Sequence, residues 1–230
     1  MIGVVERLWR HPVKSMRGES LDVLAVDDRG AVGDRLFAVR DEAGKFGSGK
    51  DTRRFRRIDG LFRFHARYEG GTPVVAFPDG SEVAGDDPRI HEALSRELGL
   101  QVTLAREAAV SHLDAGPLHL ITTSSLAALG LADEDARRFR PNLVVRTDGA
   151  GFVEDEWLGR RIHLGEEVVV EIISTTERCR MIGLPQGELP ASPGLLRELA
   201  ASRDARFGVY ARVLVPGSVG VGDRLRFAVP

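Results

Sequence analysis

The sequence predicts a β-rich α+β fold, and three features of the 230-residue chain support this prediction. Short segments with strand patterns recur along the chain, turn-forming residues separate them, and few segments have the spacing of helices. Hydrophobic residues make up 43% of the chain and charged residues 29%, a balance typical of a globular protein with a sizeable core. A chain of this length forms one large domain or two small ones.

The first part of the chain has the pattern of short strands joined by turns. Residues 61–69 alternate between apolar and polar side chains, which is the period of a half-buried strand. Residues 33–46 predict two strands joined by a turn, and residues 73–83 repeat this pattern around a Pro-Asp-Gly turn. Closely spaced short strands of this kind are typical of a barrel or a sandwich.

A helix is predicted next, between Asp87 and Gly99. Asp87 can cap the helix, Pro88 suits its first position, and Gly99 suits its end. Residues 105–117 then mix polar and apolar types and end in Gly-Pro, which favours a domain boundary there. We therefore expect a β-barrel-like first domain over residues 1–105.

The second domain, residues 106–230, mixes helices and strands, as in the α+β class. The patterns predict two short helices within residues 122–139, a strand at 141–147, a hairpin at 161–176, a helix at 192–202 with Ser192 as its cap and Pro193 in its first position, and strands at 208–215 and 222–229.

Composition and charge disfavour several classes of function. The net charge of −2 argues against a general nucleic-acid or membrane binder. No apolar run approaches the ~20 residues that are needed to cross a bilayer. The first ten residues contain charges and no hydrophobic signal segment. We therefore expect a cytoplasmic protein with neither nucleic acid nor membrane among its partners.

Cys179 is the only cysteine, so the chain alone cannot form an internal disulfide or a four-cysteine metal site. It follows an apolar strand and lies between Arg178 and Arg180, near a strand end where functional sites are often built. A nearby guanidinium favours the thiolate, which is the form that attacks or ligates. The alternative is a small buried cysteine that serves only packing.

Lys14 and Ser15 lie in a glycine-ended loop after the first predicted strand. A lysine ammonium, a serine hydroxyl and free loop amides together suit a phosphate. The segment lacks the glycine-rich pattern of a Walker A loop. The simpler interpretation is a solvated loop lysine.

Arg140 and Asn142 flank Pro141, where a helix must give way to a strand. Arginine at such a position can hold an anion with two hydrogen bonds, and asparagine supplies both a donor and an acceptor. The alternative is a charged helix end followed by a turn asparagine. Arg35 follows Asp34 at the start of a strand, where a surface ion pair is the simpler interpretation.

Two further groups of side chains are weaker candidates. Residues 154–156 place three carboxylates before Trp157, either as acid–base groups or as a solvated turn. The six histidines lack the spacing of a metal site.

Seven motifs occur together along the chain: "HPVKS", "GDRLFAV", "LITTSSLAAL", "FRPNLVV", "FVEDEW", "ERC" and "GVYARVLVPGSVGVGD". In this order and at this spacing the chain resembles the MOSC family, the molybdenum cofactor sulfurase C-terminal domain, preceded by that family's N-terminal β-barrel domain. The resemblance covers nearly the whole chain, and the layout is similar to that of the amidoxime reducing components. It implies that the second domain is also a β-barrel, with short helices.

The resemblance also implies an activity and a site. It implies an oxidoreductase that binds the molybdenum cofactor, Mo-molybdopterin, and reduces N-hydroxylated or N-oxide small-molecule substrates. Cys179 matches the cysteine whose thiolate ligates molybdenum, which makes it the implied metal ligand and catalytic residue. The implied cofactor-binding residues are Lys14, Ser15, Arg35, Thr123, Ser124, Arg140, Asn142 and Arg178.

Such a reaction consumes electrons, and the sequence shows no motif for a redox centre that could deliver them. The chain has neither the cysteines for an iron–sulfur cluster nor a dinucleotide-binding motif. We therefore expect a separate redox protein of the ferredoxin or flavoprotein type as electron donor.

Three other functions stay open on the residues alone. A sulfur carrier or sulfurtransferase would hold a persulfide on Cys179 and use the same thiolate. A non-catalytic binding module would use Cys179 only for packing. A pyridoxal-phosphate enzyme would form its imine on Lys14, but no other part of the sequence points to that chemistry.

Overall fold

The computed structural model describes residues 1–228, which are rich in strands and contain only short helices. The strands are β1 Gly3–Arg10, β2 Glu19–Leu21, β3 Val23–Asp27, β4 Gly30–Ala31, β5 Phe37–Asp41, β6 Phe46–Ser48, β7 Phe55–Arg57, β8 His65–Glu69, β9 Thr72–Ala76, β10 Glu82–Ala84, β11 Val102–Arg106, β12 Leu118–Thr122, β13 Leu143–Arg146, β14 Arg161–Leu164, β15 Val168–Glu177, β16 Arg206–Val215, β17 Gly217–Gly220 and β18 Arg224–Phe227. The α-helices are α1 Arg89–Leu98, α2 Thr123–Ala128, α3 Ala136–Phe139 and α4 Leu195–Arg203. The 3₁₀ helices are η1 Leu61–Arg63, η2 Asp133–Asp135, η3 Val153–Trp157 and η4 Arg180–Gly183.

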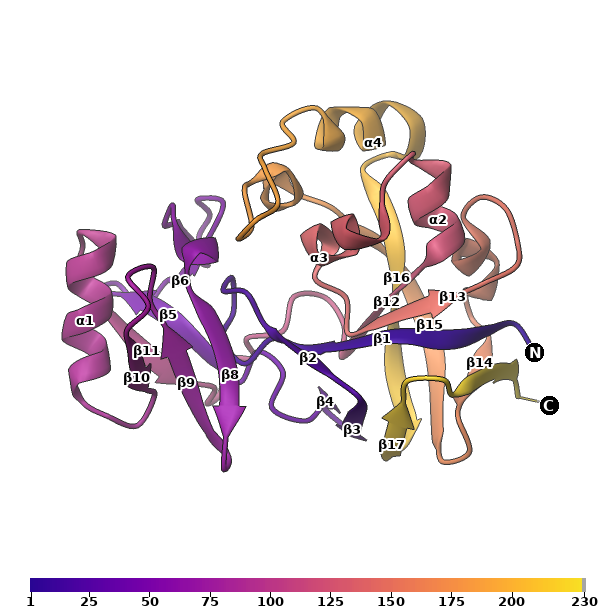
Figure 1. Cartoon of the computed structure of the whole chain (residues 1–230), viewed down its shortest axis with the longest axis horizontal. Coiled ribbons are helices and arrows are strands. Elements are labelled where there is room, and N and C mark those ends of the chain that lie inside the picture. The colour runs from indigo at the N-terminus through magenta and orange to yellow at the C-terminus, as the bar shows by residue number, and fades with distance from the viewer. Residues whose placement is uncertain (229–230) are drawn as a thin grey trace.

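Two β-rich parts lie side by side in the molecule (Figure 1). One part contains β5 to β11 and α1, and the other contains β12 to β18 with the three remaining α-helices above it. This arrangement confirms the predicted β-rich α+β class with two barrel-type parts and few short helices.

Seven strands form a closed barrel in the order β13-β12-β16-β15-β14-β18-β1, and β1 closes it by pairing antiparallel with β13. The barrel interior follows from the period-two pattern of its strands. In β15, for example, Val168, Val170 and Ile172 point inward and are fully buried. These side chains join those of the neighbouring strands in one aliphatic core.

The other part combines two small sheets, β11-β5-β6-β7 and β10-β9-β8, with α1. Its core contains Phe64 and Phe77, whose ring centroids lie 5.2 Å apart. Helix α1 buries Ile90 and Leu94, which are one turn apart and therefore on the same face. The part thus has its own hydrophobic core, separate from that of the closed barrel.

Short helices cover one end of the closed barrel through a third core. Phe139 from α3 and Phe207 from β16 stack there with ring centroids 4.0 Å apart. Ile182 from η4 and Leu199 from α4 complete this core. Because α3 and η4 are anchored in this way, the residues at their ends are held in fixed positions.

The N-terminal strands belong partly to the closed barrel. Strand β1 pairs with β13 and β18, and β3 pairs with β17. The division into residues 1–105 and 106–230 stays a prediction, and these three strand pairings cross it. Val229 and Pro230, which end the predicted last strand and the second domain, lie outside the described residues.

The prediction of one strand over residues 61–69 is wrong in its first half. Gly60 has a φ of +90°, and η1 follows it, so the strand begins only at His65. Leu61 and Phe62 are both buried, although an alternating strand would bury only one of two neighbours. The alternation of apolar and polar residues over 61–69 therefore spans the 3₁₀ helix η1 and the following strand β8, and it does not belong to one strand.

The other predicted helices and the hairpin are present, but two helix starts differ from the prediction: α1 begins at Arg89 rather than at Pro88, and α4 begins at Leu195 rather than at Pro193. The Asp87 carboxylate accepts from the Arg89 amide at 2.9 Å, and Gly99 ends α1 with a φ of 69°. Helix α4 begins at Leu195, whose amide donates to the Ser192 carbonyl at 3.2 Å, so the predicted side-chain cap by Ser192 is wrong. In the described part of the chain no helix combines the length and the hydropathy that crossing a membrane requires.

Candidate functional site

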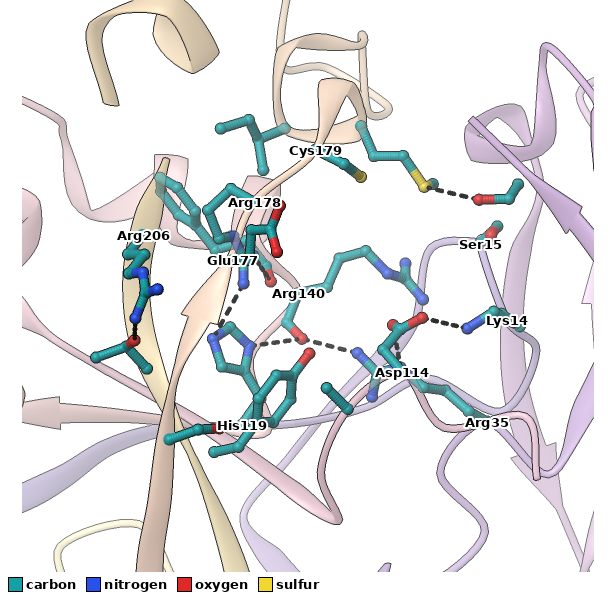
Figure 2. Close-up of a pocket in the computed structure, with 18 of the residues that line it drawn as sticks. Lys14, Ser15, Arg35, Asp114, His119, Arg140, Glu177, Arg178, Cys179 and Arg206 are labelled. Carbon is teal, nitrogen blue, oxygen red and sulfur yellow. Dashed lines mark hydrogen bonds and ion pairs between the residues drawn. The ribbon is translucent and has the colours of Figure 1, made fainter. Parts of the chain in front are cut away.

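A cavity of about 710 Å³ lies between the two parts of the molecule, within the size range of small-molecule and cofactor sites. Figure 2 shows side chains from both parts pointing into it. Its charged side chains are mostly cations, so the cavity suits an anionic ligand. The charged lining residues are Lys14, Arg35, Lys50, Arg54, Arg138, Arg140, Arg178 and Arg206, with Asp114 and Glu177 as the two carboxylates.

Lys14 and Ser15 stand on the side of the cavity built by the segment after β1. The Lys14 amide donates to the Phe37 carbonyl at 2.8 Å, and the Ser15 hydroxyl donates to the Gly47 carbonyl at 3.0 Å. Both residues are only 4% exposed, which excludes the interpretation as a solvated loop lysine. We call Lys14, Ser15 and Arg35 the N-terminal wall.

The Lys14 ammonium is neutralised within the protein. Its Nζ pairs with the Asp114 carboxylate and donates to the His112 carbonyl at 2.9 Å. Burial lowers the pKa of Lys14 below its ordinary value, although Asp114 acts in the opposite direction. Burial would raise the pKa of Asp114, but the charges of Lys14 and Arg35 hold it below its ordinary range, so the carboxylate stays ionised.

Arg35 is likewise neutralised. Its guanidinium pairs with the carboxylate of Asp34, which is fully buried, and its Nη2 donates to the Arg140 carbonyl at 3.0 Å. Burial opposes the charged form of Arg35, but the Asp34 carboxylate outweighs it and raises the pKa of Arg35. The simple interpretation as a surface ion pair is wrong, because Arg35 is 7% exposed.

Arg140 comes from the C-terminal part, at the end of α3, and its guanidinium reaches across to the segment after β1. Its φ of 53° and ψ of 49° turn the chain sharply, and Pro141 prevents the helix from continuing. Its Nη1 donates to the Met16 carbonyl, whereas its Nη2 is buried without a hydrogen-bond partner. Burial and the charge of Arg35 lower the pKa of Arg140 to about 9.

Arg178 and Cys179 follow the end of β15 and complete this side. The Arg178 amide donates to the Ala205 carbonyl at 2.7 Å, and its guanidinium donates to the Phe139 carbonyl while its Nε lacks a partner. Burial lowers the pKa of Arg178. We call Arg140, Arg178 and Cys179 the C-terminal wall.

Cys179 is half-buried and lines the cavity, and it is the single free thiol of the chain. Its backbone is extended, with φ −126° and ψ 177°, at the point where β15 gives way to η4. Figure 2 shows Cys179 across the cavity from Lys14 and Ser15, on the same side as Arg178. The thiol is therefore accessible from the cavity, which the interpretation as a packing residue does not require.

Three residues of the site have left-handed backbone conformations. Ser15, Arg35 and Arg140 have φ values of 66°, 49° and 53°. Residues other than glycine adopt this conformation at a cost, and such strain tends to gather at functional sites. In the described residues only Asp204 and Ala205 share it outside the cavity, so the strain is concentrated around this one space.

His119 on β12 links the cations of the site. Its Nε2 lies 3.3 Å from Arg178 Nη1, and its Nδ1 lies 3.4 Å from the Arg140 carbonyl. Burial and the charges of Arg178 and Arg35 lower the pKa of His119 well below its ordinary value, so the ring is neutral. A neutral ring that donates from Nδ1 can accept from Arg178 at Nε2, which fits both contacts.

Three predicted binding residues do not line the cavity. Thr123 Oγ1 accepts from the Thr147 amide at 3.3 Å, and Ser124 accepts from the Thr147 hydroxyl at 2.9 Å. Asn142 is buried, where its Oδ1 accepts from the His119 amide at 3.1 Å. Asn142 therefore orients the strand that carries His119, and Thr123 and Ser124 fix the turn into α2.

The carboxylates of residues 154–156 form no acid–base pair at the cavity. Glu154 is fully buried, and its carboxylate accepts from the hydroxyls of Thr122 at 2.7 Å and Ser125 at 2.6 Å. Asp155 pairs with Arg203. The interpretation as a solvated turn is thus wrong for Glu154, which ties η3 to the start of α2.

Comparison with known protein families matches residues 99–226 to the MOSC domain. The chain belongs to the MOSC family. Residues 2–115 match the MOSC N-terminal beta barrel domain, which agrees with the resemblance seen in the motifs. A search of curated proteins found no match.

Two solved structures are similar to this chain. The YUAD protein from Bacillus subtilis aligns with a TM-score of 0.51 and 15% identity, covering 98% of this chain and 94% of the other. A structure described as a hypothetical protein aligns with a TM-score of 0.47 and 11% identity, covering 100% of this chain and 70% of the other. At such identities the first alignment supports the fold alone.

The residues of this MOSC cavity fit a cofactor that brings its own metal ligands. Among residues 1–228 no group of three His, Cys, Asp or Glu side chains could hold a metal ion by itself. Cys179 offers one soft thiolate, which suits a metal that already has soft sulfur ligands. Buried nitrogens of Arg138, Arg140 and Arg178 lack partners, and such donors suit the oxygens of a phosphate.

Several lining residues were not foreseen from the sequence of this MOSC protein. Asp114 lies in the segment that was taken only as a domain boundary, and His119 and Tyr210 lie on strands that face the cavity. The Gly-Pro ending of the boundary segment marks a loop between the two parts, which is a signal that could have pointed to Asp114. His119 and Tyr210 carry no comparable signal, because their partners are distant in sequence.

Proposed function

We propose that this MOSC protein is an oxidoreductase that holds the molybdenum cofactor in the cavity and reduces N-hydroxylated or N-oxide compounds. The observation that carries the proposal is an accessible single thiol beside buried guanidinium groups with unpaired donors. A thiolate ligates a soft metal centre, and the guanidinium donors balance the charge of a phosphate-bearing pterin. When bound, the cofactor supplies a metal that changes its oxidation state by two electrons and accepts an oxygen atom from the substrate.

The residues of the chain divide the work of holding the cofactor. Cys179 would be the protein ligand to the metal. Arg140 and Arg178 would donate to the phosphate and pterin oxygens, because their unpaired nitrogens are already desolvated and need no rearrangement. Lys14 and Ser15 would bound the opposite side of the same space.

A separate protein would deliver the electrons. We propose a ferredoxin or flavoprotein, because the chain has a single cysteine and no dinucleotide-binding motif. Three exposed cations line the cavity, Lys50, Arg54 and Arg206, and they favour an acidic donor.

The test is reduction of an N-hydroxylated amidine with a chemically reduced dye as electron source. We expect Cys179→Ala to lower the rate by at least about 100-fold, because the protein ligand to the metal is lost. Its free energy of unfolding should change by less than about 1 kcal/mol, because the thiol is half-buried and makes no hydrogen bond. Ser202→Ala, an exposed change on α4, serves as control. Full activity of Cys179→Ala would contradict the proposal.

The same thiol keeps a sulfur carrier as the second candidate. An accessible thiol among cations suits a persulfide, which would pass its outer sulfur to an acceptor and leave the thiolate behind. The intact mass separates the two functions. A reducible gain of one sulfur atom on the wild type, absent from Cys179→Ser and without bound metal, would favour the carrier.

A further inference from the structure

A second pocket of about 310 Å³ opens beside the cavity. One side comes from residues 57–63 of the N-terminal part, and the other from residues 180–185, which follow Cys179. Ser48 and Met181 line both spaces, and the Ser48 hydroxyl donates to Met181 Sδ at 3.8 Å. This side-chain pair therefore forms part of the border between the second pocket and the cavity.

The interior of the second pocket is apolar. Ile58, Leu61 and Phe62 form one side and are 4%, 3% and 5% exposed, and Leu184 and Pro185 face them. An apolar cavity of about 150 Å³ accommodates benzene. The second pocket therefore has room for one aromatic ring with a short substituent, or for an alkyl chain of similar volume.

The charges at the rim of this pocket are paired. Arg57 lies 2.9 Å from Asp59, and Arg180 on the facing segment lies 3.8 Å from the same carboxylate. Arg63 pairs with Glu97 at 3.0 Å. Each cation of the rim thus has a carboxylate partner, in contrast to Arg140 and Arg178 in the cavity, so the second pocket favours an uncharged ligand.

The second pocket also adjoins the C-terminal wall of the cavity. Phe62 lies under Arg140, whose guanidinium carbon is 5.5 Å from the ring centroid. Met181 is two residues from Cys179 and forms part of the border between the two spaces. A molecule whose apolar body fills the second pocket can therefore extend a polar group past Met181 to the side of the cavity that carries the thiol.

We infer that the second pocket binds the apolar body of a neutral substrate, aromatic or short-chain aliphatic, and presents its polar nitrogen–oxygen group to the cavity. This inference rests on the proposed function for the identity of the polar group. Ile58, Leu61, Phe62 and Leu184 then determine which substrates are accepted, and Met181 limits how far the body can enter.

The test uses a probe that the protein cannot reduce. Binding of 4-fluorobenzamide is measured by fluorine NMR on the protein purified from cells that make the cofactor. Fluoroacetamide, which lacks the ring, should bind at least about 10-fold more weakly. Leu184→Asp, which puts a charge against the apolar wall, should weaken binding of the ring probe by at least about 10-fold. Leu214→Asp, at a surface position on β16 that is 38% exposed, should leave it unchanged.

A second variant tests the border without adding a charge. A Cβ at Gly49 would lie 2.7 Å from Met181 Cγ, so Gly49→Ala must displace that side chain and should weaken probe binding by about 3-fold or more. Gly194→Ala is the control, because no atom lies within 4 Å of its added Cβ. Absence of probe binding, or binding that Leu184→Asp and Gly49→Ala leave unchanged, overturns the inference.

Failure of this inference can be told from failure of the proposed function. Probe binding needs no metal. A protein that contains molybdenum but does not bind the probe keeps the proposed function and overturns the second pocket. A protein that binds the probe in the predicted way but contains no molybdenum keeps the pocket and overturns the proposed function.

Discussion

The two walls of the cavity carry the same kinds of side chain but differ in how those side chains are partnered. On the N-terminal wall, Lys14 and Arg35 each pair with a carboxylate. On the C-terminal wall, Arg140 and Arg178 have no carboxylate within ion-pair distance among residues 1–228, and each has a buried nitrogen without a partner. A buried donor without a partner costs free energy, so its persistence needs an explanation.

The C-terminal wall is the one whose arginines are free to bind an anionic ligand. An arginine that is already neutralised gains little from an anion, because it must give up an existing partner. An arginine that is desolvated and unpaired gains the full charge-assisted hydrogen bond. We therefore assign the main anion contacts to Arg140 and Arg178, and to the N-terminal wall the role of shaping the space.

The largest expected effect is a difference in phosphate affinity between the two walls. The protein is prepared without cofactor, and inorganic phosphate is titrated by calorimetry. Arg140→Met should weaken binding by about 10- to 100-fold, because a charge-assisted hydrogen bond is lost. Lys14→Met should weaken it by no more than about 3-fold, because Asp114 already neutralises that cation.

The free energy of unfolding serves as control for this comparison. Arg140→Met removes a desolvated charge but also the hydrogen bond to the Met16 carbonyl, so its free energy of unfolding should fall by no more than about 1–3 kcal/mol and the protein should stay folded. Equal losses of affinity in the two variants would contradict the assignment of roles to the walls.

The pH dependence of phosphate affinity should follow Arg140. Its pKa in the ligand-free protein is lowered to about 9, so the guanidinium is charged at neutral pH and loses its proton as the pH rises through that value. Phosphate affinity should therefore fall between about pH 8 and pH 10, roughly 10-fold in all. Arg140→Met should abolish this fall, and a fall of the same size in that variant would point to another group.

A smaller change in phosphate affinity is expected when a cation of the N-terminal wall loses its carboxylate partner and thus becomes unpaired, as the arginines of the C-terminal wall are. Asp114→Asn removes the carboxylate that holds Lys14, so the ammonium becomes available to a ligand. Phosphate affinity should rise by about 5-fold, in line with about 1 kcal/mol for an ion pair of this kind. Glu177→Gln, which removes the other carboxylate of the cavity, is the matched control and should raise it less, because within residues 1–228 Glu177 forms no ion pair that would release a cation.

Local motifs of the sequence pointed to several residues that line the cavity, although their roles there stay a prediction. Lys14, Ser15, Arg35, Arg140 and Cys179 each stand at a turn or at the end of an element, where loop residues, Pro141 or the end of an apolar run mark the position. Binding and catalytic residues often stand where a strand or helix ends, so these residues were candidates before their positions in space were known.

The remainder of the site depends on contacts between distant parts of the chain. Asn142 stood in the same motif as Arg140 but turns away to hold β12, because the left-handed turn at Arg140 reverses the chain direction. Asp114 pairs with Lys14, which is 100 residues away in the sequence. His119 contacts Arg178, which is 59 residues away. No periodicity in a single segment reports such contacts.

The proposed function requires that the cavity hold a molybdenum cofactor through Cys179. The most direct measurement is the content of molybdenum and phosphorus, by elemental analysis, in freshly purified protein from cells that make the cofactor, with Cys179→Ala prepared in parallel. We predict about one molybdenum and at least about one phosphorus per wild-type chain, and loss of the molybdenum from the variant. Wild-type protein with neither element, or a variant that keeps its full molybdenum content, would contradict the account.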